Sequence, residues 1–198
     1  VGAVRVAATE RSKDKGVLVV LNDEIDSARD VVKSDSGKTD SFVTPSYGLL
    51  GIIDPDRVIY YRESLNLEKI LTDKIESNID IVKCYSGSDG RFIKSSIENG
   101  ASAVVIEAFG RGNIPRKMLP AVEEALEKNI LIVVCSRTYK GRVISEYGYP
   151  GGGKYLSNKG VILGGDLRGN KMRIKLMILF GKYNDSKRVK KYLIENAG

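Results

Sequence analysis

The feature that most constrains the fold is a set of unbroken apolar runs in the second half of the chain, separated by amphipathic segments. The runs lie at residues 79–84, 103–108, 130–135 and 161–163. Strands without apolar–polar alternation are buried on both faces, as in a parallel sheet covered by helices. We therefore predict an α/β domain over residues 77–198, in which helices cover both faces of a parallel sheet.

The segments between these runs carry apolar side chains at helical spacing. Residues 90–98 are followed by Asn99-Gly100, a pair typical of a helix C-terminus. Pro120 fits a helix only within its first turn. Two last helices are expected near residues 171–180 and 186–195.

The first part of the chain has a different character. Residues 1–13 show a helical pattern without an N-cap, residues 17–22 include a short apolar run, and residues 34–48 suit a hairpin or loop. We expect residues 1–55 to be the remnant of a larger N-terminal α/β domain, and residues 56–76 to form an interdomain connection. Because the first helix lacks a start signal, we also expect further sequence to precede it.

Composition excludes several kinds of chemistry. The chain has no His, which excludes Ser-His-Asp triads, Cys-His pairs and His-ligated metals. Cys84 and Cys135 each end an apolar run, so we expect buried free thiols, with no disulfide scaffold, zinc site or cofactor. No apolar run approaches the roughly 20 residues of a membrane helix, and no signal peptide is visible. We therefore predict a cytoplasmic protein without membrane contact.

The net charge is +7, from 32 Lys and Arg against 25 Asp and Glu, a balance that raises nucleic acid as a partner. Most basic residues, however, are interleaved with acidic ones. The exceptions are Lys187, Arg188, Lys190 and Lys191, which we interpret as the exposed face of the last helix. We therefore predict no nucleic-acid partner.

Ligands of open parallel sheets bind beyond the carboxyl ends of the strands, here residues 85–90, 109–113 and 136–138. Their Gly and small polar residues would allow a ligand to approach, or could simply form tight turns. Two glycine-rich patterns fail as phosphate sites. Pro115 replaces the third Gly of a dinucleotide motif, and Tyr155 replaces the Ser or Thr of a P-loop. We interpret residues 148–155 as a mobile glycine-rich loop.

Three motifs resemble the bacterial-type L-asparaginase family. They are Asn22-Asp23 with Ala28-Arg-Asp-Val-Val-Lys33, the turn Tyr85-Ser-Gly-Ser-Asp-Gly, and Phe109-Gly-Arg-Gly-Asn113. The likeness covers essentially the whole chain. It implies a two-domain amidohydrolase that converts L-asparagine, or L-glutamine, to the acid and ammonia, in a homo-oligomer built as a dimer of dimers.

The resemblance also implies a Thr nucleophile in a Thr-Gly-Gly-Thr segment and a Thr-Asp pair in a Gly-Thr-Asp-Thr segment. Neither segment occurs among these 198 residues. We therefore expect the chain to be the C-terminal portion of such an enzyme, and to be inactive by itself.

Two site residues follow from the resemblance. Lys33 matches the catalytic Lys that works with the Thr-Asp pair, and Asn113 matches the substrate-binding Asn that is projected into a neighbouring subunit's active site. The alternatives are a surface lysine after a short helix and a helix N-cap. A further family carboxylate has no convincing counterpart in residues 151–154, and Glu146 is only a nearby candidate.

Two other functions stay open. The first is the asparaginase-like subunit of a tRNA-dependent amidotransferase, which would carry a small β-barrel ahead of the nucleophile. The second is a nucleotide- or nucleic-acid-binding α/β module, which steeply salt-dependent binding would support.

Overall fold

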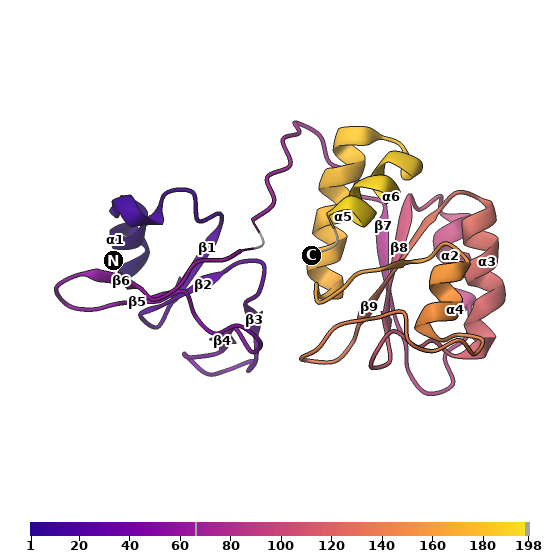
Figure 1. The fold of residues 1–198 in the computed structure, drawn as a ribbon, viewed down its shortest axis with the longest axis horizontal. Helices are drawn as coiled ribbons and strands as arrows, with labels where there is room; N and C mark the ends of the chain where they lie inside the picture. The colour runs from indigo at the N-terminus through magenta and orange to yellow at the C-terminus, as the bar shows by residue number, and fades with distance from the viewer. Residues whose placement is uncertain (66, 197–198) are drawn as a thin grey trace. The chain divides into compact units, whose positions relative to one another are not determined.

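The computed structural model describes residues 1–65 and 67–196 (Figure 1). The chain forms two compact units, Val1–Lys69 and Ile70–Gly198. Within the described residues, no helix is long and apolar enough to cross a membrane.

The first unit is built on an antiparallel sheet with strand order β1-β2-β5-β6. Its elements are α1 (Gly2–Ala8), a 3₁₀ turn (Glu10–Ser12), β1 (Leu18–Leu21), β2 (Glu24–Ser27), β3 (Val32–Lys33), β4 (Phe42–Val43), β5 (Gly51–Ile53) and β6 (Val58–Tyr60). The short strands β3 and β4 form a separate hairpin within residues 32–43, where a hairpin or loop was predicted.

A two-residue turn at Asn22-Asp23 sets the course of the chain after β1. Both residues have positive φ, 49° and 58°, and Leu21 pairs with Glu24. This is the geometry of a type I′ hairpin, in which Asn and Asp tolerate the left-handed conformation. The short helix considered before Lys33 is therefore wrong, because residues 24–27 form a strand of this hairpin instead.

A small core holds the first unit together. It consists of the buried side chains of Val6, Ile25, Leu50, Ile53 and Tyr60. Helix α1 contributes Val6, and the remaining members come from the sheet and from the residue that precedes β5. Strand β6, at the start of the expected connection over residues 56–76, pairs with β5 and so belongs to this sheet.

The second unit contains the predicted parallel sheet, with strand order β10-β9-β8-β7. Its strands are β7 (Ile79–Lys83), β8 (Ala103–Ala108), β9 (Leu131–Ser136) and β10 (Ile162–Leu163). Its helices are α2 (Arg91–Glu98), α3 (Leu119–Glu127), α4 (Gly153–Asn158), α5 (Gly169–Tyr183) and α6 (Ser186–Glu195), with a 3₁₀ turn at Arg116–Met118. The α/β fold class is confirmed.

Alternate residues of each central strand enter two different cores, which explains the unbroken apolar runs. On β8, Val104 and Ile106 pack on one face with residues of α2, α3 and α4, whereas Ala103 and Val105 pack on the other with α5 and α6. Figure 1 shows these helices in layers on either side of the strands. The expected cover of both faces is thus present.

Helix boundaries follow recognisable local chemistry. Pro120 lies in the first turn of α3, as predicted. Helix α5 ends at Asn184, which has a left-handed φ of 47°, and the Asp185 carboxylate caps α6 by accepting hydrogen bonds from two backbone N–H groups. Helix α4, by contrast, was not expected, because its glycine-rich start suggested a loop.

Candidate functional site

Lys33 lies on the β3–β4 hairpin of the first unit, where it pairs with Phe42. Its side chain is exposed, and its Nζ lies 5.3 Å from the centroid of the Phe42 ring. The ring supports the aliphatic stem and attracts the ammonium group. Lys33 thus projects its charge from a strand rather than from the end of a helix.

A buried hydrogen bond ties this hairpin to the main sheet of the unit. Thr44, directly after β4, donates its hydroxyl to the carboxylate of Asp26 on β2, at 2.5 Å. The two side chains are 8% and 3% exposed. Burying a carboxylate without a partner would be costly, so this bond fixes where the hairpin lies. Sequence reasoning missed it, because the residues are 18 positions apart and share no motif.

The same carboxylate affects its neighbour on β2. Partial burial raises the pKa of Glu24, and the charges of Asp26 and Asp40 raise it further. The first unit therefore carries an acidic group that holds its proton more strongly than an exposed glutamate does.

Asn113 lies in the second unit, in the turn that follows β8. Gly110 and Gly112 have φ values of 45° and 106°, which allow the chain to turn back sharply. Phe109 and Asn113 then form an isolated bridge, in which the backbone N–H of each donates to the carbonyl of the other, at 2.9 and 3.0 Å. The backbone of Asn113 is therefore fixed at the carboxyl edge of the sheet.

The structure excludes the N-cap alternative for Asn113. Helix α3 begins at Leu119, with Met118 in the N-cap position, and the preceding 3₁₀ turn is capped by Pro115. The side chain of Asn113 instead accepts a hydrogen bond at its Oδ1 from the hydroxyl of Tyr149, at 3.0 Å.

The segment that carries Tyr149 packs closely against the turn that carries Asn113. A Cβ on Gly151 would lie 2.4 Å from the carbonyl oxygen of Ile114, and one on Gly153 would lie 2.3 Å from that of Ile144. The glycines are therefore required for backbone contact rather than for phosphate binding. Glu146, the nearby carboxylate candidate, lies 4.0 Å from the guanidinium of Arg111, with both groups largely exposed.

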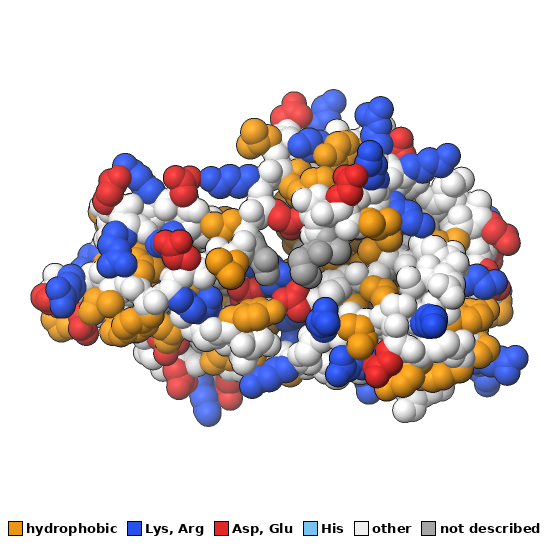
Figure 2. All heavy atoms as spheres, in the orientation of Figure 1, with side chains coloured by type: hydrophobic (Ala, Val, Ile, Leu, Met, Phe, Trp, Pro, Cys, Tyr) orange, Lys and Arg blue, Asp and Glu red, His pale blue; other side chains and the backbone are white. Residues whose placement is uncertain are grey.

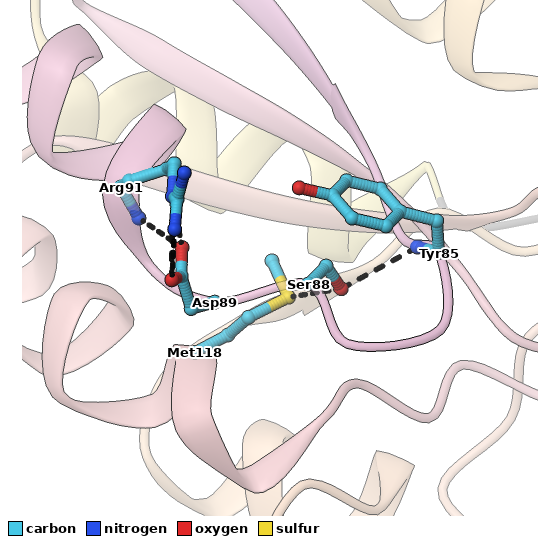
Figure 3. Close-up of polar contacts among 5 residues, drawn as sticks. All are labelled: Tyr85, Ser88, Asp89, Arg91 and Met118. Atoms are coloured by element: carbon cyan, nitrogen blue, oxygen red, sulfur yellow. Dashed lines mark hydrogen bonds and ion pairs between the residues drawn. The ribbon is translucent and has the colours of Figure 1, made fainter.

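The turn after β7 is shown in Figure 3. Buried Ser88 accepts a hydrogen bond from the backbone N–H of Tyr85, at 3.4 Å, and donates one to the sulfur of Met118, at 3.5 Å. Asp89 pairs with Arg91 two residues later, and hydrogen bonds from the Arg91 side chain and backbone lower the pKa of this carboxyl. These polar groups are engaged within the fold, as the tight-turn interpretation expects.

The turn after β9 links the other two turns. Ser136 donates its hydroxyl to the carbonyl of Gly110 at 2.7 Å, and Arg137 donates to the carbonyl of Cys84 at 2.8 Å. The Arg137 guanidinium also lies over the ring of Phe109, 4.2 Å from its centroid. The carboxyl edge of the sheet is thus a cross-linked platform on which Asn113 is held.

Both cysteines are buried free thiols, as predicted. Burial raises the pKa of Cys84 to about 11 and that of Cys135 to about 12. Reactive cysteines instead have lowered pKa values in exposed, positively charged surroundings. These thiols are therefore part of the core.

Basic and acidic side chains are interspersed over the face of each unit seen in Figure 2. The four basic residues near the end of the chain lie on α6, whose buried positions are Val189 and Leu193. Arg188 and Lys191 pair with Asp185 and Glu195. Such a surface fits the exposed helix face inferred from the sequence.

Both units match family models. The model described as "Glutaminase/Asparaginase C-terminal domain" matches residues 78–193, and the model described as "Asparaginase, N-terminal" matches residues 1–66. An L-asparaginase of Bacillus licheniformis is 36% identical over 183 residues, which cover 92% of this chain and 57% of the relative. A glutamyl-tRNA(Gln) amidotransferase polypeptide of Methanococcus vannielii is 30% identical over 206 residues, covering 96% of this chain and 47% of the relative.

A solved structure gives the same result. The crystal structure of a probable cytoplasmic L-asparaginase from Campylobacter jejuni has a TM-score of 0.83 and 30% sequence identity, covering 98% of this chain and 59% of that chain. The chain therefore spans about half the length of the curated relatives it matches. With one family model over most of its second unit and another over its first, the chain belongs to the glutaminase/asparaginase family.

Proposed function

We propose that the whole protein is an L-asparaginase, which hydrolyses the side-chain amide of asparagine to give aspartate and ammonia. Family membership supports this, since relatives of this chain include L-asparaginases from several bacteria. The observation that carries the proposal is the position of Asn113. Its side-chain amide is held at the carboxyl edge of a parallel sheet, where such sheets bind ligands.

Lys33 and Asn113 would have different roles in this reaction. Lys33 is proposed as a catalytic residue whose ammonium stabilises the carboxylate of a Thr-Asp pair and so helps to activate a hydroxyl nucleophile. Asn113 is proposed to bind substrate in the active site of a neighbouring subunit, within a dimer of dimers. Water supplies the oxygen of the new carboxylate, and the amide nitrogen leaves as ammonia, so no cofactor is required.

The 198 residues contain neither threonine segment of the family, so the isolated chain is expected to release no ammonia. A cytoplasmic location is proposed on the printed description of the Campylobacter jejuni relative.

The test is ammonia release by the whole protein with asparagine and with glutamine as substrates. The parent should hydrolyse asparagine, and Lys33→Met should retain the fold by circular dichroism while losing roughly 10²–10³ in kcat, the usual effect of removing one preorganised electrostatic group. Lys38→Met is a matched control, because Lys38 is exposed on the same hairpin. Parent-like turnover by Lys33→Met would remove Lys33 from the mechanism.

A second candidate is the tRNA-dependent amidotransferase function, favoured by the 30% identity with the amidotransferase polypeptide of Methanococcus vannielii. Such a protein would release ammonia for a partner enzyme. Ammonia release that depends on a partner enzyme and a tRNA substrate would favour this function over free asparagine hydrolysis.

A further inference from the structure

The side chains of Tyr149 and Asn113 meet although they are 36 residues apart in sequence. The hydroxyl of Tyr149 donates to Oδ1 of Asn113, at 3.0 Å. Tyr149 is 52% exposed and Asn113 is half-buried, so the pair lies at the surface of the unit. Nothing in the asparaginase-type motifs named above accounts for this tyrosine.

Both partners are held independently of each other. The backbone of Asn113 is fixed by the bridge to Phe109. Tyr149 is the first residue of a type II turn, with Pro150 in the second position and Gly151, at a φ of 96°, in the third. The backbone N–H of Gly152 closes this turn on the carbonyl of Tyr149, at 2.8 Å.

Two further contacts restrict Tyr149. Its ring stacks on that of Tyr147, with centroids 5.5 Å apart and planes inclined by 30°. The carbonyl of Gly151 accepts a hydrogen bond from the backbone N–H of Ile114, at 2.9 Å, which joins the turn to the residue after Asn113. The hydroxyl is thus delivered to Asn113 by a preorganised turn and a stacked pair of rings.

The contact decides which end of the amide faces outward. An asparagine side chain offers an acceptor oxygen and two donor hydrogens, and it reverses them by rotating about its last bond. Here the oxygen is occupied by the Tyr149 hydroxyl, whereas Nδ2 has no acceptor within the described residues. Asn113 therefore presents two N–H donors.

We propose that Tyr149 is a positioning residue, which orients Asn113 so that it donates hydrogen bonds to an oxygen acceptor of the substrate, a carboxylate or an amide carbonyl. This rests on the proposed function, in which Asn113 binds substrate. The arrangement favours an oxygen over an ammonium group at this point of the site, because an ammonium group needs an acceptor and meets donors instead.

The first test needs no enzymatic activity and uses the 198-residue chain. Tyr149→Phe removes the hydroxyl and keeps the ring, and Tyr147→Phe is the matched control, since the Tyr147 hydroxyl has no hydrogen-bond partner in the part of the chain that the structure describes. The side-chain NH₂ signals of Asn113 are identified in ¹⁵N–¹H spectra by their loss in Asn113→Ala. They should shift in Tyr149→Phe and stay in place in Tyr147→Phe. Unchanged signals in Tyr149→Phe would overturn the proposal.

The second test is a double-mutant cycle in the whole enzyme. Tyr149→Phe should raise KM for asparagine about threefold to tenfold, the usual effect of one hydrogen bond, with kcat nearly unchanged. In the Asn113→Ala background the same substitution should have no further effect, because Tyr149 acts only through Asn113. An additive effect in that background would refute the positioning role.

These outcomes also distinguish failure of the positioning role from failure of the proposed function. If the parent enzyme hydrolyses no amide, the proposed function fails, while the spectra still report whether Tyr149 orients Asn113. If Asn113→Ala raises KM but Tyr149→Phe does not, the proposed function survives and the positioning role is wrong.

Discussion

Replacing Gly151 by alanine should test how strongly the glycine-rich turn is fixed on the sheet edge. Gly151 has a φ of 96°, a conformation that L residues rarely adopt, and an added Cβ would lie 2.4 Å from the carbonyl oxygen of Ile114. The backbone would have to move, and the hydrogen bond from Ile114 N–H to the Gly151 carbonyl would weaken or break.

Other glycines of the same loop separate these two effects. Gly141 has the same φ of 96° but nothing within 4 Å of an added Cβ, and Gly148 has neither constraint. The backbone conformation alone costs about 1–2 kcal/mol, so Gly141→Ala should lose that much. Adding about 0.5–1.5 kcal/mol for the hydrogen bond, together with the displaced carbonyl, brings the expected loss for Gly151→Ala to about 2–4 kcal/mol. Gly148→Ala should be close to neutral.

The assay is urea unfolding of the chain followed by circular dichroism at 222 nm, which reports mainly on the helices of the second unit. With a slope of about 1–3 kcal/mol/M, the midpoint for Gly151→Ala should fall by about 1 M or more. If Gly151→Ala and Gly141→Ala lost the same stability, the contact with Ile114 would contribute nothing, and the account of this turn would be wrong.

Two further predictions concern buried groups. Thr44→Val should destabilise the first unit by about 1–3 kcal/mol, because it leaves the buried Asp26 carboxylate without this donor, whereas Thr39→Val at an exposed position should not; equal effects in denaturant unfolding would contradict this. Native Cys84 and Cys135 should react with a thiol reagent only on unfolding at about pH 8.5, near the ordinary pKa of a thiol. Because their folded pKa values of about 11 and about 12 exceed the ordinary 9.0, the associated stability is full below pH 9 and declines as pH rises above it; rapid labelling of the native chain would refute their assignment to the core.

The second unit was largely predictable from sequence because its strands are buried on both faces. Strand β8 and helix α6 have the bounds that the apolar runs and helical spacing predict. Helix α4 was missed because its first turn contains glycines that contact the carbonyls of distant residues, such as Ile144, and no local pattern reports such contacts.

The first unit was harder to predict, since its strands are short and depend on pairing between distant segments. A Cβ on Gly51 would lie 2.1 Å from the carbonyl of Ile59, so β5 depends on a close approach that the sequence does not indicate. The Asn22-Asp23 turn was a readable hairpin signal, and recognising it would have replaced the helix considered before Lys33.

The candidate site divides in the same way. Lys33 and Asn113 could be proposed from the resemblance because each lies in a recognisable motif. Tyr149 could not, because its role depends on a hydrogen bond that spans 36 residues. The Pro150-Gly151 pair did carry a turn signal, but a turn alone does not indicate what its first residue contacts.

The most direct test of the central claim is complementation between protomers in the whole enzyme. Protomers carrying Lys33→Met are mixed with protomers carrying Asn113→Ala under conditions that exchange them between oligomers, and ammonia release from asparagine is measured. If each site combines Lys33 of one protomer with Asn113 of its neighbour, a mixed pair rebuilds one intact site. Random assortment should then restore about a quarter of the parent's turnover from two impaired variants. No recovery in verified mixed oligomers would contradict the role of Asn113 in a neighbouring protomer's active site.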